Sequence, residues 1–561
     1  MIPSVADYLA SRIADLGIDR VFGVPGDYTF PFDDAIEANP GLRWILCANE
    51  LNAAYAADGY GRRFGAAALT TTYGVGELSA LNGVMGSRAH NVPVIHVVGM
   101  PSLRIIHQKL ITHHTLGDGD SGKFFDISAS AACASTILTP QNAITEIDRL
   151  LDEALRQCKP VYFVVPHDQG KLPVIGTPRP GKPISDIRRQ HSVEVELDNA
   201  VDAILARLGS ARHPVVIPSH MIARFQLQAK LSHFLAKSHI PFATMPMSKG
   251  VITESHPDYI GLYNGDYSSP TEVRHIVETA DLLIDFGGMI LAELNAGLWS
   301  DTLPADRMIS IHADWVQVGS SVWTNIALED LIDRLIEKAP RCEDRPDLPV
   351  PQRLDLPGAP GEPTCSANLY PRIQRMLRPG DVLVAETGTC MLHLNKMLLP
   401  DQVGYESQSV WGSIGWATPA ATGICMANTT GRTIMVTGDG SHGMTLNDLS
   451  VMGRYGIKPI IFVLKNDIHG IEDLVGDLGH VFNVLPLIPY HQLPAALGCD
   501  DWLTAEVKTV RELDAMIDRI QSHDGAAYIS VAIPPSESKP LPEAVRNRMY
   551  KVNTPSPADA P

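Results

Sequence analysis

The sequence predicts an α/β protein with three doubly wound parallel-sheet domains, and three observations lead to that prediction. The 561-residue length exceeds the roughly 100–200 residues that one domain usually holds. The β-branched apolar runs are continuous rather than alternating, as in strands that are buried on both faces. Amphipathic stretches of helical spacing separate these runs, which is the order of elements in parallel sheets covered by helices.

The first expected element is a helix, because apolar residues recur at helical spacing between Val5 and Leu16 and Ser4 can cap it. A short strand over Arg20–Val24 then leads into a Pro-Gly turn that ends at Asp27. The other strands are expected in the continuous apolar runs at 94–98, 161–165, 215–217, 282–286, 308–311, 382–385, 434–436, 460–464 and 528–532.

Two Pro- and Gly-rich stretches without periodicity, at 171–186 and 341–364, are interpreted as linkers. They divide the chain into domains at 1–180, 188–340 and 360–550. The terminal sequence PSPADAP is expected to be disordered.

Composition excludes several classes of function. The chain has 45 basic and 63 acidic residues and a net charge of −18, which argues against a nucleic-acid or membrane partner. Its eight cysteines form no C-x-x-C pair, so we expect reduced thiols rather than disulfides or a zinc site. Charges at Asp7, Arg12 and Asp15 are unlike a signal peptide, and no uncharged apolar run reaches the roughly 18 residues of a membrane span. We therefore expect a cytoplasmic enzyme.

One glycine-rich segment is misleading. Residues 117–122, GDGDSG, match G-x-G-x-x-G literally, but they follow no strand and their aspartates would repel a pyrophosphate. We interpret them as an exposed acidic loop; a calcium loop is a further alternative, although it lacks the terminal glutamate. A nicotinamide dehydrogenase is therefore disfavoured.

A second glycine loop has the right context for a phosphate. Gly438, Asp439, Gly440 and Ser441 follow the strand at 434–436 and precede a helix expected through residues 444–449. Asn466 comes 27 residues after Asp439, at the end of the next strand. Adjacent parallel strands would bring the two side chains together as oxygen ligands for Mg²⁺ and a diphosphate. The alternative is a structural turn with an unrelated asparagine.

Four separated motifs together resemble those of the thiamine diphosphate-dependent 2-oxo acid decarboxylases, the pyruvate and indolepyruvate decarboxylase family. They are the GDGS loop with Asn466, the segment Cys47–Ala54, the turn Val24–Asp27, and the pair His113-His114 with WGSIG at 411–415. The resemblance extends from Val5 to Val531. Lys465 stands where the family has a first asparagine, and Thr429 where it has a proline.

The resemblance implies a pyrimidine-binding first domain, a diphosphate-binding third domain, and a middle domain with a structural or regulatory role. Thiamine diphosphate would be bound through Glu50, Gly388, Gly412, Ile414, Gly438, Asp439, Gly440, Ser441, Asn466 and Ile468. Mg²⁺ would be held by Asp439, Asn466 and the main chain of Ile468. Glu50 would bond to the aminopyrimidine nitrogen. Without the resemblance, Glu50 reads equally well as a helix cap.

The same resemblance places Asp27, His113, His114 and Glu472 around the reacting carbon, together with Glu50 as the catalytic set. Carboxylates and imidazoles in one cleft take different protonation states, which supplies an acid and a base at one pH. Paired histidines alone are more often surface residues. Ile468 and His469 replace the family's glycine and tyrosine, which leaves the conformation of this loop open.

The substrate pocket is expected to include Met391, Leu392, Ile471 and Val475. Members restricted to pyruvate carry an aromatic residue where this chain has Met391, and methionine is thinner and more flexible. Branched or aromatic 2-oxo acids are therefore expected to be accepted as well as or better than pyruvate. The alternative is that a repacked neighbour refills the space.

The implied reaction is non-oxidative decarboxylation of a 2-oxo acid to an aldehyde and CO₂ through an enamine on the cofactor. The alternatives are a strict pyruvate decarboxylase, a carboligase of the acetolactate synthase type, and an inactive regulatory protein that binds the cofactor. The resemblance further implies a homodimer or homotetramer with active sites between subunits.

Overall fold

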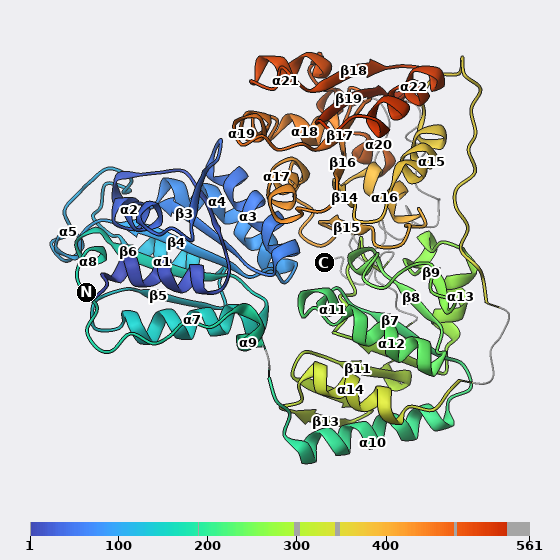
Figure 1. The fold of residues 1–561 in the computed structure, drawn as a ribbon, viewed down its shortest axis with the longest axis horizontal. Coiled ribbons are helices and arrows are strands. Elements are labelled where there is room, and N and C mark those ends of the chain that lie inside the picture. The colour runs from blue at the N-terminus through green and yellow to red at the C-terminus, as the bar shows by residue number, and fades with distance from the viewer. Residues whose placement is uncertain are drawn as a thin grey trace, which may run out of the picture.

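The computed structural model describes residues 2–188, 190–296, 303, 305–342, 348–475 and 480–535, without the side chains of 473–475. Its strands form three sheets, from residues 20–166, 214–324 and 382–532, and each sheet is covered by helices (Figure 1). The expected disorder of the C-terminal tail concerns residues outside the described ones. Among the described helices, none has both the length and the hydropathy to cross a bilayer. None of the eight cysteines forms a disulfide in the structure.

The N-terminal sheet has six parallel strands in the order β2-β1-β3-β4-β6-β5. They are β1 (Arg20–Gly23), β2 (Arg43–Leu46), β3 (Ala67–Thr72), β4 (Val94–Met100), β5 (Ala134–Ile137) and β6 (Val161–Pro166). One core joins the sheet to α1 (Val5–Asp15), α2 (Phe30–Ala38) and α7 (Ala143–Gln157). A second core, on the other face, includes α3 (Glu50–Phe64) and α4 (Val75–Ala89). The remaining helices are short: η1 (Asp27–Thr29), α5 (Leu103–His107), α6 (Gly122–Ala129), α8 (His167–Gly170) and α9 (Ile184–Arg188).

The first helix agrees with its prediction. The Ser4 hydroxyl accepts a hydrogen bond from the Asp7 amide at 3.1 Å, and the Asp7 carboxylate accepts one from the Ser4 amide at 3.2 Å. This reciprocal pair satisfies amides that a helix start would otherwise leave without a partner. Gly17, after the helix, has a φ of +87°, which few other residues adopt.

The middle sheet has seven strands in the order β13-β12-β11-β10-β7-β8-β9. They are β7 (Pro214–Pro218), β8 (Phe242–Thr244), β9 (Tyr259–Leu262), β10 (Leu282–Phe286), β11 (Met308–Ile311), β12 (Trp315–Val318) and β13 (Ser321–Thr324). Its helices are α10 (Glu194–Ser210), α11 (Met221–Arg224), α12 (Gln228–Ser238), η2 (Pro246–Ser248), η3 (Gly265–Tyr267), α13 (Glu272–Thr279), η4 (Ala305–Arg307) and α14 (Leu328–Lys338). The sheet is not wholly parallel, because β12 is antiparallel to both of its neighbours. Connections this short between β11, β12 and β13 permit only antiparallel pairing.

The C-terminal sheet is fully parallel, in the order β15-β14-β16-β17-β19-β18. Its strands are β14 (Val382–Ala385), β15 (Gly404–Ser407), β16 (Thr433–Gly438), β17 (Ile460–Lys465), β18 (Leu503–Val507) and β19 (Ala527–Ala532). The longer helices are α15 (Ser366–Met376), α16 (Thr389–Asn395), α17 (Ala417–Ala427), α19 (Asp448–Arg454) and α22 (Val510–Gln521). The shorter ones are α18 (Asp439–Gly443), α20 (Gly470–Val475), η5 (Val481–Asn483), η6 (Tyr490–Gln492) and α21 (Leu493–Ala496).

The continuous helix expected after Ser441 is wrong. The chain forms α18 and α19 with a break at residues 444–447. In that break the Thr445 hydroxyl donates to the Gly415 carbonyl at 2.7 Å, and Met444 is mostly exposed. The chain therefore turns away after α18 to meet the segment that precedes α17.

The first and third sheets are joined through α3 and α17, which lie side by side (Figure 1). One hydrophobic cluster continues across both, from Tyr55 and Ala56 on α3 to Ala420 and Ile424 on α17. The two sheets thus share a core within a single chain.

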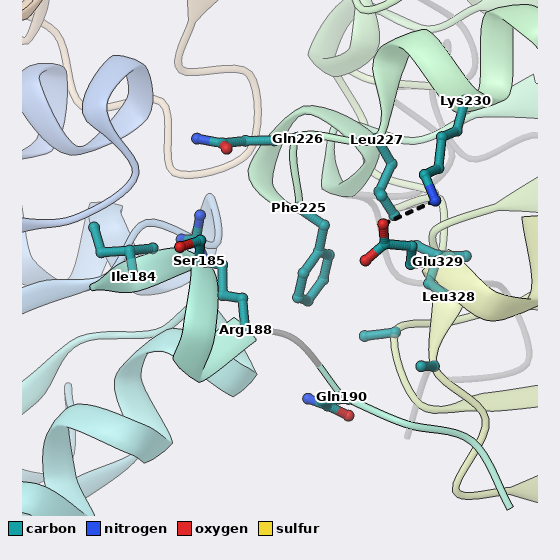
Figure 2. A pocket seen from close by; sticks show the side chains of 12 residues that line it. Ile184, Ser185, Arg188, Gln190, Phe225, Gln226, Leu227, Lys230, Leu328 and Glu329 are labelled. Carbon is teal, nitrogen blue, oxygen red and sulfur yellow. Dashed lines mark ion pairs between the residues drawn. The ribbon is translucent and has the colours of Figure 1, made fainter. Parts of the chain in front are cut away.

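A cavity of about 450 Å³ lies between α9 and the middle sheet's helices, and none of its described lining residues is a predicted site residue (Figure 2). Phe225 projects into it, with Arg188 on one side and an ion pair between Lys230 and Glu329 (2.8 Å) on the other.

Candidate active site

The carboxyl ends of β14, β16 and β17 meet at one edge of the C-terminal sheet and form a cavity. Because β14 lies between β15 and β16, the strand order reverses here, which is where parallel sheets bind ligands. Ten of the predicted residues line this cavity: Gly388, Ile414, Gly438, Asp439, Gly440, Ser441, Asn466, Ile468, Ile471 and Glu472.

Three main-chain amides hold the Asp439 carboxylate in this cavity. Its Oδ1 accepts the Gly440 amide at 2.9 Å, and its Oδ2 accepts the amides of Asn466 (3.1 Å) and Asp467 (2.7 Å). These bonds tie the GDGS loop to the loop after β17. Burial raises the pKa of Asp439 to about 6, and the three amides partly offset that effect.

Contacts of Lys465, Asn466, Asp467 and His469 shape the loop after β17. Asp467 has a φ of +60°, and its carboxylate pairs with Lys465 at 2.7 Å. The Ile468 amide donates to Asn466 Oδ1 at 3.3 Å. His469 lies against Gly440, where a Cβ would come within 2.8 Å of the imidazole ring.

These residues fit a diphosphate with a divalent cation. Asp439 and Asn466 offer the hard oxygen donors that Mg²⁺ prefers. A Cβ at Gly438 would meet no atom within 4 Å, so the loop leaves open space beside its backbone. The carboxylate accepts bonds from uncharged amides, while the nearby Lys465 is paired with Asp467. A cation would therefore add the positive charge that this buried carboxylate lacks.

A second group of predicted residues lies at the carboxyl ends of β1 and β4. The His113 imidazole is 3.1 Å from the Asp27 carboxylate and stacks on Tyr28, with ring centroids 4.7 Å apart. The His114 ring meets His113 edge-on at 4.6 Å. One ligand atom from each of Asp27, His113 and His114 lies within 4.8 Å of the others. Both Asp27 and His113 are about half exposed in the single chain, at 51% and 53%.

The histidine loop is held by the turn before α4. Gly74, with φ +66°, packs so tightly that a Cβ would lie 2.6 Å from the His114 carbonyl oxygen. The buried Glu77 carboxylate accepts the Gly74 amide (2.8 Å) and the hydroxyls of Ser128 and Tyr162 (both 2.6 Å). Glu77 thus fixes the turn on which the histidines rest.

Glu50 begins α3, immediately after the Asn49 cap, whose side chain accepts the Asn52 amide at 2.8 Å. Its carboxylate lies near Gly76, where a Cβ would come within 3.3 Å of Oε1. Glu50 therefore lies close to the first turn of α4, in the N-terminal domain that also carries the histidines.

Within one chain the two groups remain apart. The described lining of the C-terminal cavity includes no residue from the N-terminal sheet or its helices. Glu472, predicted to join the histidines, lies on the wall of this cavity and is exposed.

The structure differs from the predicted substrate pocket at Met391. This side chain is 1% exposed and packs in the core of the C-terminal sheet, with Leu394 and Cys390. The reason is that α16 turns this face toward the sheet. Leu392 is partly exposed, Ile471 lines the cavity, and the side chain of Val475 lies outside the described residues. Gly412 has a φ of +67° and follows the half-exposed Trp411.

Two further residues of this region, Glu386 and Tyr490, were not predicted as site residues. Glu386, directly after β14, is fully buried and accepts the amides of Thr387 (3.0 Å) and Ala417 (3.1 Å). Burial raises its pKa to about 7. An acid directly after a predicted buried strand was the signal that could have identified it. The Tyr490 hydroxyl donates to the Asp439 carbonyl at 2.8 Å, and nothing in the sequence indicates this contact.

Three family models match the chain in the order of its sheets. They describe the thiamine pyrophosphate (TPP) enzymes: the N-terminal TPP-binding domain at residues 3–121, the central domain at 201–338 and the C-terminal TPP-binding domain at 386–531. Thiamine pyrophosphate is another name for thiamine diphosphate. The chain belongs to the thiamine pyrophosphate enzymes.

Within this family the chain is a decarboxylating lyase of the 2-oxo acid decarboxylase group. It is 35% identical over 539 residues to an alpha-keto-acid decarboxylase of Mycolicibacterium paratuberculosis, covering 95% of this chain and 94% of that protein. It is 33% identical over 521 residues to pyruvate decarboxylase isozyme 3 of Saccharomyces cerevisiae, covering 91% and 92%. This TPP enzyme therefore matches such relatives along nearly its whole length.

A solved structure supports the fold. An X-ray structure assigned as a thiamin diphosphate-dependent enzyme from Mycobacterium smegmatis superposes with a TM-score of 0.77 at 20% identity, covering 95% of this chain and 99% of the other.

Proposed function

We propose that this enzyme converts a 2-oxo acid to an aldehyde and CO₂, with thiamine diphosphate and Mg²⁺ as cofactors. The observation that carries the proposal is the cavity at the ends of β14, β16 and β17, where Asp439 and Asn466 meet beside the open backbone of Gly438. When bound, thiamine diphosphate supplies the electron sink that a departing CO₂ requires and that no side chain provides.

Each predicted cofactor-binding residue has a proposed task. Asp439, Asn466 and the main chain of Ile468 hold Mg²⁺, and the Gly438–Ser441 loop binds the diphosphate. Gly388 and Gly412 bind the cofactor through their main chains, and Ile414 packs between its two rings. Glu50 bonds to the pyrimidine nitrogen, where a charged partner in a water-poor site is strongest.

Proton handling is assigned to Asp27, His113, His114 and Glu472. The contact between His113 and Asp27 supports this role, because it places an imidazole and a carboxylate within hydrogen-bonding distance of each other. These residues would supply the proton that the carbon needs after losing CO₂ and would accept the proton from the oxygen that becomes the aldehyde carbonyl. Glu472, on the cavity wall, would complete the set.

The N-terminal group (Glu50, Asp27, His113 and His114) and the C-terminal cavity can act on one substrate only if a second chain brings its N-terminal group to that cavity. We therefore propose a homodimer, or a tetramer of two dimers, with each site shared between chains. The exposure of Asp27 and His113 in the single chain supports this arrangement. A cytoplasmic location stays a prediction.

We also propose that branched or aromatic 2-oxo acids are accepted at least as well as pyruvate. Met391 is buried in the core and gives no support to this substrate range. The described cavity lining, however, holds no Phe, Tyr or Trp that would shorten the pocket. Each additional buried methylene would contribute about 0.8 kcal/mol to binding.

The experiment is a panel of pyruvate, 4-methyl-2-oxopentanoate and phenylpyruvate, incubated with thiamine diphosphate and Mg²⁺, with aldehyde, CO₂ and acetolactate measured. Aldehyde and CO₂ in equal amounts support decarboxylation. Acetolactate as the main product would favour a carboligase, and a clear preference for pyruvate would contradict the proposed pocket size. No turnover of any acid, despite cofactor binding, would indicate a regulatory protein.

A further inference from the structure

The peptide group between Gly412 and Ser413 is held by one buried side chain. The Ser413 amide donates to Gln408 Oε1 at 2.9 Å, and Gln408 is 0% exposed. A peptide is planar and almost always trans, so its carbonyl points opposite to its N–H. By fixing the Ser413 N–H, Gln408 also fixes the direction of the Gly412 carbonyl.

Gly412 itself has little packing to hold it. A Cβ there would meet only the Thr387 methyl group, at 4.0 Å, and the residue has a φ of +67°. A glycine in open space has more conformational freedom than any other residue. The direction of its carbonyl must therefore be set by hydrogen bonds on either side.

Gln408 is in turn fixed by its surroundings. It follows β15, and its main-chain carbonyl accepts the Thr387 hydroxyl at 3.0 Å. A Cβ on Gly86 of α4 would lie 2.7 Å from Gln408 Nε2, so this glycine makes room for the amide. The N-terminal domain thus closes over the side chain that holds the peptide.

Two further residues of the N-terminal domain, Tyr55 and Asn82, hold segment 411–413 through hydrogen bonds to its side chains. Tyr55 Oη lies 2.5 Å from Ser413 Oγ, and Asn82 Nδ2 donates to the same hydroxyl at 3.0 Å. Asn82 Oδ1 accepts the Trp411 indole N–H at 2.8 Å. The residues before and after Gly412 are therefore both anchored on α3 and α4.

We propose that Gln408 is a positioning residue that directs the Gly412 carbonyl at the amino group of the cofactor's pyrimidine, and that Tyr55 and Asn82 support it. This inference rests on the proposed function, which assigns Gly412 to the cofactor. Without the hydrogen bond from Ser413 to Gln408, the Gly412–Ser413 peptide is free to rotate. The protein then binds the cofactor less tightly and aligns it less well.

The test compares Gln408→Met with Gln374→Met. Gln374 is a matched control, since it is 1% exposed in the same domain and its Oε1 accepts the Leu354 amide, also at 2.9 Å. Both variants remove one buried amide acceptor and retain side-chain length. The readouts are the Kd for thiamine diphosphate with Mg²⁺ by equilibrium dialysis, kcat, KM and the Tm of the apoprotein.

We expect Gln408→Met to raise the cofactor Kd and lower kcat, each by about tenfold, with KM within threefold. Gln374→Met should lower Tm comparably but leave Kd and kcat within twofold. Gln408→Glu retains an acceptor oxygen and should recover most of the affinity. Tyr55→Phe, which removes one hydroxyl, should weaken cofactor binding about threefold. If Gln408→Met does not fold, Tyr55→Phe takes its place in the comparison.

Parental Kd and kcat in Gln408→Met, or equal losses in the Gln374 control, would overturn the inference. If the parent binds thiamine diphosphate but decarboxylates no 2-oxo acid, the proposed function fails, and the Kd comparison still tests the role of Gln408.

Discussion

Gly423 of α17 lies against the main chain of α3 so closely that a Cβ on it would be 1.9 Å from the Ala56 carbonyl oxygen. The contact is reciprocal, since a Cβ on Gly59 of α3 would lie 2.2 Å from the Ala420 carbonyl oxygen. The two helices therefore meet backbone to backbone. This contact sets how the N-terminal and C-terminal sheets of one chain are placed relative to each other.

Gly423→Ala should therefore destabilise the protein, because the new methyl group forces two packed helices apart. Overpacking of a core typically costs about 1–3 kcal/mol, and backbone atoms cannot move aside as side chains do. Chemical denaturation monitored by circular dichroism measures the loss.

Gly209→Ala is the control, since Gly209 lies in α10 and a Cβ there would meet no atom within 4 Å. It should stabilise by about 0.5–1 kcal/mol through backbone entropy. Equal stability of the two variants would show that α3 and α17 are not in close contact.

Glu50→Gln should leave the fold intact and lower kcat by a factor of about 10²–10³, because an amide is a weaker, neutral partner for the pyrimidine nitrogen. Glu37→Gln, at an exposed acid of α2 in the same domain, should have no effect. Steady-state kinetics at saturating cofactor measure both. A parental rate for the Glu50 variant would refute the assignment.

Asp439→Ala should abolish retention of the cofactor on dialysis, and EDTA should do the same to the parent. The carboxylate would be missing both as the proposed Mg²⁺ ligand and as the acceptor of three amides that hold the loop. Asp467→Asn is the comparison, because it removes a nearby carboxylate that pairs with Lys465 and is not assigned to the metal. Asparagine also tolerates the φ of +60° at this position. Cofactor retained by the alanine variant without metal would contradict the metal site.

Asp448 predicts a pH dependence of stability. Its carboxylate is fully buried, accepts bonds from Thr422 and Asn52 (3.3 Å to Asn52), and lies near the buried Cys47 thiol. Burial raises its pKa from 3.8 to about 7. The folded state therefore retains this proton where the unfolded state loses it, and stability falls as pH rises from about 4 through 7.

Between pH 5 and pH 8, Asp448 should contribute a loss of about 2–3 kcal/mol in the free energy of unfolding. Asp448→Asn cannot titrate, so the variant should gain on the parent by this amount as pH rises. The measurement is urea denaturation of both proteins across that range. A difference that is constant with pH would show that Asp448 is ionised in the folded state throughout.

The sequence predicted the structure correctly where a local element, such as a helix start or a buried strand, favours particular residue types. Ser4 at the start of α1, and the continuous apolar runs that became β4 and β6, needed no knowledge of distant contacts. The grouping of Asp439 with Asn466 followed from parallel neighbouring strands, and the cavity confirms that they lie together.

The rest depended on tertiary contacts that spacing does not encode. The break between α18 and α19 arises where Thr445 bonds to Gly415, far away in sequence. Met391 was assigned by comparison with aromatic residues at the same place, but the direction of its side chain is set by how α16 packs on the sheet. Gln408 was missed because its partner is a main-chain amide, which no residue pattern reveals.

The proposed active site is shared between two chains, and complementation tests this arrangement directly. Glu50→Gln and Asp439→Ala chains, co-expressed with different tags and purified over both, would form mixed dimers in which one site has both residues intact. Since each mixed dimer has one intact site of two, activity should return to about a quarter to a half of the parental value, although each variant alone is nearly inactive. Mixed protein no more active than the single variants, while the parent turns over, would contradict the shared site.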